Sequence, residues 1–180
     1  MLEQLAHYSA PVLTMPAVRR TRRNHGLEHA TIHILSRKRV HLSGRSDDSG
    51  FVLLGDVKTE DVEEAVSEAL QRMKNGEHNL AIHPNCGTNL LTTGLLASLV
   101  GLIGLGGVSR RESFNRLPTV LLGMMAVILF SPLLGMELQR LFTTDGDPQD
   151  MEVLRIQRRQ FHLPFRVAPV VLHRVSTRSS

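Results

Sequence analysis

The residues with the clearest capacity for chemistry lie in the stretch HGLEHATIHILS, residues 25–36. His25, Glu28 and His29 follow the pattern H-x-x-E-H, the order found in the ligand helix of inverzincin peptidases. On a helix that turns 100° per residue, these three side chains share one face, opposite an apolar face that can pack. Two histidines one turn apart can bind one metal ion, and Glu28 between them can accept a proton from a water molecule held by the metal.

A second group of donor side chains lies in HPNCGTN, residues 83–89. His83 and Cys86 are three residues apart across a proline turn, so both can face inward from one loop. Cys86 precedes an apolar stretch, and the N-terminus of a helix there would favour its thiolate. Because zinc needs at least a third protein ligand, we expect the two groups to meet, with the ligand set His25, His29, His83 and Cys86. Mixed His and Cys ligation favours zinc over magnesium or calcium, while iron or copper fits parts of the set.

Each group also has a purely structural interpretation. The H-x-x-E-H helix can present a solvated face or a set of hydrogen-bonded core histidines. The HPNCGTN segment can be a turn in which Thr88 or Asn89 caps the next helix and Cys86 is a small apolar side chain. As the only cysteine of the chain, Cys86 excludes an internal disulfide, and a nucleophile activated by a histidine is a third interpretation.

Four arginines in the run RRTRR, residues 19–23, precede the histidine helix. A solvated charge run is the simplest interpretation, and contact with an acidic substrate group or with anionic lipid is the alternative. The lipid contact would use Arg19, Arg20, Arg22 and Arg23.

The net charge of +4 does not indicate a nucleic-acid partner. Residues 1–88 carry equal numbers of basic and acidic side chains, and the basic excess lies near the apolar stretches and in residues 138–180. That distribution fits lipid headgroups better than a groove that follows phosphates. The chain has six Phe, one Tyr and no Trp, so it is also poorly equipped to stack bases.

Two apolar stretches predict a transmembrane helical hairpin. The segments 89–108 and 117–136 each hold about the 20 uncharged residues that a bilayer core requires, with the short polar loop SRRESFNR between them. Glycines in the first segment would let the two helices pack closely. The alternative is a buried helix pair of a soluble protein.

The rest of the chain predicts an α+β fold, a small soluble α-β-β-α-β domain joined to the two-helix transmembrane hairpin, with a C-terminal extended tail. Asn24 is the expected N-cap of the first helix, and Thr59 that of the second. The strands are expected at residues 39–44 and 50–56, around a turn at 45–49, and at 78–83. The tail is β-rich at 165–175, where Pro169 interrupts it, and would either complete the sheet or lie along the membrane. Residues 176–180 are expected to fray.

These elements divide the chain into four segments. We expect a basic segment at 1–23, a soluble α+β domain with the metal site at 24–88, the hairpin at 89–137 and the tail at 138–180.

Several of these segments resemble a known family. The stretches NHGLEHATIHILS, SGRSDDSGFVLLGDV, HPNCGTNLLTTG and QRLFTTDGDPQDMEV resemble domain-of-unknown-function family 6391, which consists of small bacterial membrane proteins. The chain is also similar to a wider bacterial and plastid membrane family with an H-G-x-E-H helix and an H-P-x-C-G-T turn. The resemblance implies a common site that also includes supporting residues: His25, Glu28, His29, His83, Cys86, Gly87 and Thr88. It implies no particular reaction, and the chain lacks the downstream glutamate ligand segment of inverzincin peptidases.

The sequence thus leads to two functional hypotheses. The first is a membrane-bound zinc hydrolase in which Glu28 is the general base and the substrate is a peptide, an amide or a lipid-linked molecule. The second is a non-enzymatic scaffold or assembly factor with a structural metal site closed by four protein ligands.

The expected location is the bacterial inner membrane. Because the first residues do not read as a secretory signal, the soluble domain is expected in the cytoplasm. The positive-inside rule applied to Arg110, Arg111 and Arg116 favours the opposite orientation.

Overall fold

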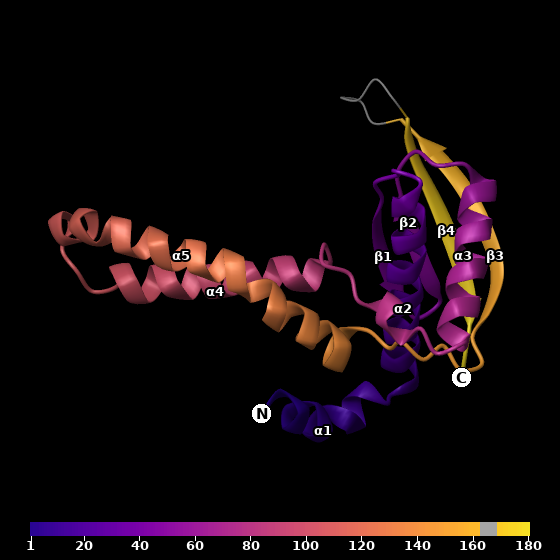
Figure 1. Cartoon of the computed structure of the whole chain (residues 1–180), viewed down its shortest axis with the longest axis horizontal. Helices are drawn as coiled ribbons and strands as arrows, with labels where there is room; N and C mark the ends of the chain where they lie inside the picture. Colours follow the sequence, from indigo (N-terminus) through magenta and orange to yellow (C-terminus); the bar gives the residue numbers. More distant parts are fainter. Residues whose placement is uncertain (163–168) are drawn as a thin grey trace. The chain divides into compact units, whose positions relative to one another are not determined.

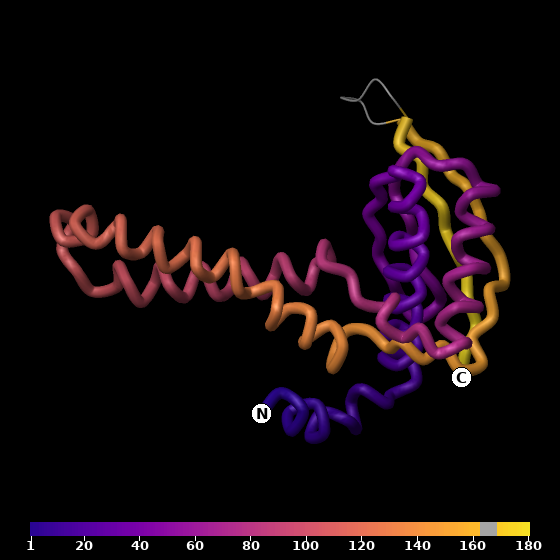
Figure 2. The backbone as a smooth tube through the Cα atoms, viewed as in Figure 1, coloured from indigo at the N-terminus to yellow at the C-terminus, as the bar shows by residue number. Residues whose placement is uncertain are grey.

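The computed structural model describes residues 1–162 and 169–180, and Figure 1 shows the order of its elements. The chain forms two compact units. The first unit combines residues 1–83 with residues 140–180, and the second is residues 84–139. Figure 2 traces the backbone through both.

The first unit is a two-layer structure in which helices pack on one face of a four-stranded sheet. Helices α2 and α3 and strands β2 and β4 supply most of its apolar core, which includes Leu27, Leu35, Phe51, Val62 and Val175. The elements of this unit are α1 (Leu2–Leu13), α2 (Pro16–Arg37), β1 (Ser43–Asp47), β2 (Gly50–Leu54), α3 (Thr59–Lys74), the 3₁₀ helix η1 (His78–Ala81), β3 (Glu152–Phe161) and β4 (Val170–Arg178).

The sheet is antiparallel throughout, in the order β1-β2-β4-β3. Strand β4 pairs with β2, with Val52 opposite Arg174, so the end of the chain lies in the middle of the sheet. The alternative in which the tail completes the sheet is therefore correct. The expectation of a frayed end is wrong, because β4 continues to Arg178 and the backbone of Ser180 donates to the Asp150 carboxylate. Residues 165–168 of the predicted β-rich stretch lie outside the described residues.

Two strand predictions differ from the structure. The strand expected at 78–83 is wrong, since residues 78–81 form the 3₁₀ helix η1. The first strand begins at Ser43 instead of residue 39, because Arg39 takes a left-handed conformation with φ of 58° just after α2 ends. Only two residues then separate β1 from β2, and the Asp47 carboxylate accepts from the Ser49 backbone there at 2.9 Å.

Helix α2 is longer than expected because it begins at Pro16, a residue that suits the first helical position. Asn24 is therefore not an N-cap. It lies in mid-helix with 1% of its surface exposed, where its amide donates to the Asp47 carbonyl at 2.8 Å and accepts from the Thr177 hydroxyl at 2.6 Å. Helix α3 begins at Thr59 itself, with Lys58 as its N-cap.

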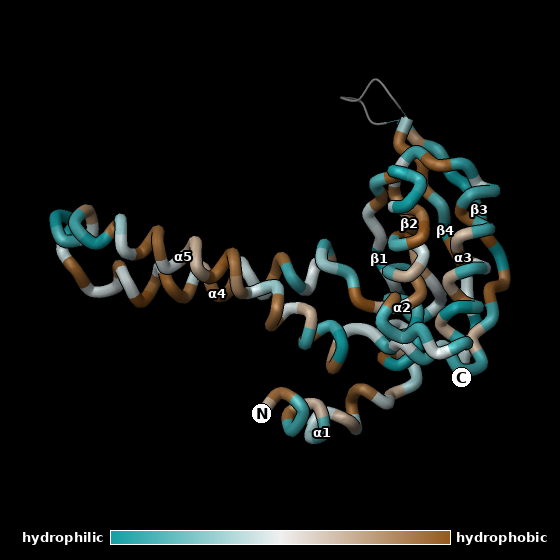
Figure 3. Tube along the Cα trace, viewed as in Figure 1, coloured by the Kyte–Doolittle hydropathy of each residue, from teal (hydrophilic) through white to brown (hydrophobic). Residues whose placement is uncertain are grey.

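The second unit is a helical hairpin of α4 (Gly87–Leu105) and α5 (Arg110–Leu138), followed by the π-helical turn η2 (Gln139–Thr143). The two helices approach closely where a glycine faces a larger side chain, as at Gly104 against Val120. Figure 3 shows that hydrophobic residues dominate both helices. Both are long and apolar enough to cross a membrane, and only 11% of the apolar window of each is buried. A core helix of a soluble protein would be mostly buried.

We predict that Asn24→Ala lowers the free energy of unfolding by about 1 to 3 kcal/mol, because the buried Thr177 hydroxyl loses its acceptor and β1 loses its link to α2. Thermal unfolding in detergent, followed by circular dichroism, measures the effect. Ser36→Ala, at an exposed position of the same helix, is the control and should change stability by less than about 0.5 kcal/mol. An unchanged melting temperature for Asn24→Ala would contradict this role.

Candidate metal centre

The histidine segment lies in a buried stretch of α2. Glu28 and His29 are each 3% exposed, and His25 is partly exposed. The apolar side chains Leu27 and Ala30 are fully buried as well, so the polar side of the helix is enclosed along with the apolar side. Buried polar groups need partners, and the partners of these residues define the candidate centre.

His25 and His29 lie one turn apart with their ring centroids 4.3 Å from each other. Each ring is tied to a backbone carbonyl through Nδ1. His29 bonds to Ala81 at 2.7 Å, and His25 bonds to Thr143 at 2.9 Å. Since a carbonyl oxygen only accepts, both Nδ1 atoms must carry the proton, and the lone pair of each neutral ring is then on Nε2. The imidazole nitrogens of the pair that could bind a metal lie within 4.8 Å of each other.

His83 brings a third imidazole to this place. Its ring centroid lies 5.8 Å from that of His29. The segment that carries it follows η1, whose Ala81 carbonyl is the hydrogen-bond partner of His29. The 3₁₀ helix η1 therefore brings His83 close to α2, although the strand expected at residues 78–83 does not form.

Cys86 is the third residue of the second unit and the N-cap of α4. Its sulfur accepts from the Thr88 backbone N–H at 3.4 Å, and the residue is buried. Gly87 is the first residue of α4. Cys86 follows His83 by three positions, so their Cα atoms are at most about 11 Å apart.

Glu28 points to strand β1. Its carboxylate accepts from the Ser46 hydroxyl at 2.5 Å, and Gly44 lies so close that a Cβ there would overlap the Glu28 side chain. Ser46 lies in β1 and not in the turn expected at residues 45–49, so the contact does not follow from the predicted elements. The sequence signal for this contact is the two-residue spacing of Gly44 and Ser46, because residues two apart in a strand face the same side.

Gly26 lets two other segments reach the histidine pair. A Cβ at Gly26 would overlap the Asp145 carbonyl oxygen and lie 3.2 Å from the Ala81 side chain. The Asp145 backbone N–H also donates to the Arg22 carbonyl at 3.0 Å. The Arg22 guanidinium donates to the carbonyls of Leu141 and Thr144, at 3.2 and 3.0 Å. Together these contacts hold residues 141–145 against α2, and Thr143 of this segment is the partner of His25.

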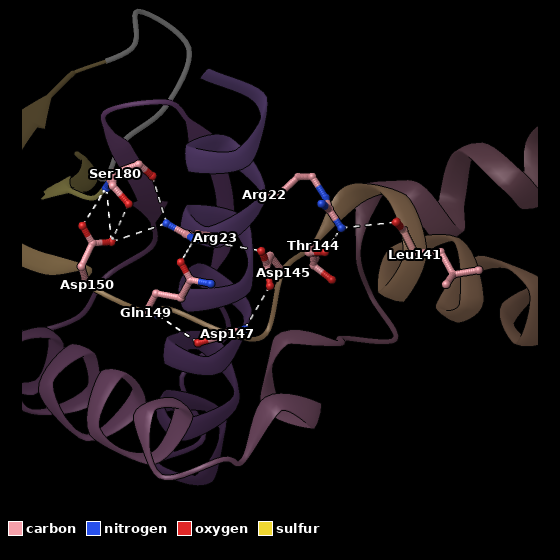
Figure 4. Close-up of polar contacts among 9 residues, drawn as sticks. All are labelled: Arg22, Arg23, Leu141, Thr144, Asp145, Asp147, Gln149, Asp150 and Ser180. Carbon is pink, nitrogen blue, oxygen red and sulfur yellow. Dashed lines mark hydrogen bonds and ion pairs between the residues drawn. The ribbon is translucent and has the colours of Figure 1, made fainter. Parts of the chain in front are cut away.

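The arginine run is largely structural, as Figure 4 shows for Arg22 and Arg23. Arg23 is 1% exposed; it donates to the Ser180 carbonyl and to the Gln149 side chain, and it pairs with Asp150 at 3.5 Å. Burial lowers the pKa of Arg22, although Asp145 opposes the shift. The expectation of a solvated run is therefore wrong at Arg23, whose guanidinium is buried and bonds to groups of the C-terminal segments.

Comparison with known proteins identifies the family. The family described as a domain of unknown function (DUF6391) matches residues 20–156, which is well over half of the chain. The chain belongs to the DUF6391 family. The match includes α2 with the histidine pair, the segment of His83 and Cys86, and both apolar helices.

One relative of this DUF6391 protein is an uncharacterized protein of Picosynechococcus sp. strain PCC 7002. The two are 45% identical over 94 residues, and the alignment covers 46% of this chain and 45% of the relative. The chain thus spans about half the length of that relative. No solved structure matches it. The predicted membership of the DUF6391 family is confirmed. The description of that family as small bacterial membrane proteins and the similarity to the wider family with the H-G-x-E-H helix stay predictions.

We predict that Gly26→Ala destabilises the first unit by about 1 to 3 kcal/mol, because the added methyl group collides with Asp145 and Ala81. Helix propensity alone would give the opposite sign, a gain of roughly 1 kcal/mol. Gly94→Ala is the matched control, since a methyl group at this helical glycine meets open space. The melting temperatures of the two variants measure the difference, and a Gly26→Ala protein as stable as wild type would contradict the packing described.

Proposed function

We propose that this DUF6391 protein is a membrane-bound zinc protein. In this proposal, His25 and His29 bind the ion through Nε2, and the segment from His83 to Cys86 supplies the third protein ligand. The observation that supports it is the pair of Nδ1 hydrogen bonds to the Ala81 and Thr143 carbonyls. Metal-binding histidines in proteins characteristically donate their second ring N–H to such a partner, which fixes the tautomer and the ring orientation.

The chemistry of the donors suits zinc. Imidazole nitrogens and thiolates are its usual protein ligands. In this proposal His25 and His29 supply two imidazoles, and the segment from His83 to Cys86 supplies one or two further ligands. The alternative is a set of core histidines without an ion, in which the same Nδ1 hydrogen bonds would only fix the orientation of the rings.

For the reaction we propose hydrolysis with Glu28 as the general base. When bound, zinc would polarise a substrate carbonyl and activate water for attack. Glu28 is adjacent to His29 in the sequence, it is buried, and the Ser46 hydroxyl holds its carboxylate. It would accept the proton of the attacking water and pass it to the leaving group.

The substrate class that we propose is a peptide, an amide or a lipid-linked molecule at the membrane surface. Helix α4, which is apolar enough to span a bilayer, begins at the residue after Cys86. The chain itself therefore keeps the segment of His83 and Cys86 close to the start of a membrane helix. The proposed location is the bacterial inner membrane, crossed by α4 and α5, with the first unit in the cytoplasm.

One observation favours a second candidate, a non-enzymatic scaffold or assembly factor. His25, His29, His83 and Cys86 make four donors, which is the number that closes a tetrahedral structural zinc site. In that case both His83 and Cys86 bind the ion, and Cys86→Ser would lose zinc and thermal stability together. In the hydrolase, three protein ligands suffice.

We predict that the protein purified in detergent without chelators contains about one zinc ion per chain, and that the double variant His25→Ala, His29→Ala loses it. Elemental mass spectrometry measures the metal content. His33→Ala is the control, because His33 lies one further turn along the same helix and is exposed. Equal zinc in all three proteins would refute the site, as would its absence from the wild type.

We further predict that Glu28→Gln keeps the zinc but lowers the hydrolytic rate by about 10² to 10⁴, the usual contribution of a general base. The rate is measured in proteoliposomes with fluorogenic peptide and phospholipid substrates. Glu63→Gln, at an exposed position of α3, is the control and should keep the wild-type rate. A fully active Glu28→Gln protein would contradict the proposed hydrolase mechanism. A zinc-loaded wild type without any hydrolysis would favour the scaffold.

A further inference from the structure

Helix α1 is amphipathic and contains no buried residue. Its apolar side chains are largely open to solvent, with 50% of Leu5, 81% of Tyr8 and 54% of Val12 exposed. Met15, just after the helix, is 53% exposed. Leaving so much apolar surface in water costs roughly 25 cal/mol per Å², so this face calls for an apolar partner.

The most exposed apolar side chains of α1 share one face. At 100° per residue, Leu5, Tyr8 and Val12 fall within an arc of roughly 60°. Glu3 and His7 lie outside this arc, each at least about 100° from all three. The polar face carries little charge, and the nearest basic side chains follow in the first turns of α2. There Arg19 is partly exposed, and Arg20 is 32% exposed and pairs with Asp48 at 3.7 Å.

We propose that α1 lies in the interface of a bilayer that contains anionic lipids, with Leu5 and Val12 inserted among the acyl chains and Tyr8 at the level of the headgroups. Amphipathic helices with an exposed apolar face bind membranes in this in-plane manner. Tyrosine favours the headgroup level, and each basic residue near an anionic surface adds about 1 kcal/mol. Arg19 and Arg20 would make that contact, unlike Arg23, which the fold buries.

The identity of this partner follows from the rest of the chain. Helices α4 and α5 are apolar enough to cross a membrane. A chain held in a membrane by these helices has a bilayer available as the apolar partner of α1. The inference rests on the proposed membrane location and is independent of the metal.

Tryptophan fluorescence tests the inference directly, because the chain has no tryptophan. The full chain is reconstituted in vesicles of phosphatidylcholine and phosphatidylglycerol with a single Leu5→Trp or Val12→Trp substitution. His7→Trp on the opposite face is the matched control. Lipids that carry a spin label close to the headgroup serve as the quencher. Ile128→Trp in α5, probed with a label deeper in the acyl chain, reports whether the hairpin spans the bilayer.

We expect Leu5→Trp and Val12→Trp to emit at shorter wavelength than His7→Trp and to be quenched at least about twofold more strongly. Equal emission and quenching on both faces would overturn the proposal. A blue-shifted signal that lipid labels do not quench would also overturn it, and would assign the face to a protein partner. If Ile128→Trp is quenched while the α1 probes are not, the in-plane helix is refuted and the membrane location stands. If Ile128→Trp is not quenched either, both fail.

Discussion

The first unit depends on the burial of the polar side of α2. Arg23, Asn24, Glu28 and His29 are each at most 3% exposed, and a buried polar group without a partner costs several kcal/mol. The partners come from segments far away in the sequence. Strand β1 supplies the hydrogen-bond partners of Glu28 and Asn24. The 3₁₀ turn supplies that of His29, and the C-terminal segments supply those of Arg23. The unit is thus assembled around one helix whose buried polar side chains bond to the segments that surround it.

This constraint explains how far the sequence could predict the fold. The β1–β2 hairpin, α3 and the two apolar helices follow from local periodicity and turn residues, and the structure contains them with shifted ends. The 3₁₀ turn at His78–Ala81 and the central position of β4 depend on contacts with α2 and β2. Such contacts leave no periodic pattern in the sequence, which is why a strand was predicted at residues 78–83.

The candidate site divides in the same way. The helical spacing of His25 and His29 sufficed to predict that their rings meet. Their hydrogen-bond partners could not be predicted, because the Ala81 and Thr143 carbonyls are backbone groups with no sequence signature. For Arg23 the same limit produced an error, since a run of arginines looks the same in sequence whether it is solvated or enclosed by Gln149, Asp150 and Ser180.

The measurement that tests the account most directly is zinc K-edge X-ray absorption on the full chain in lipid nanodiscs. The proposed site requires at least two imidazole nitrogens at about 2.0 Å from the ion, and three protein donors in all for the hydrolase. Four protein donors, including a sulfur at about 2.3 Å, would instead indicate the closed structural site. An ion with no imidazole ligand, or a protein that takes up no zinc, would contradict the central claim that the histidines of α2 bind a metal.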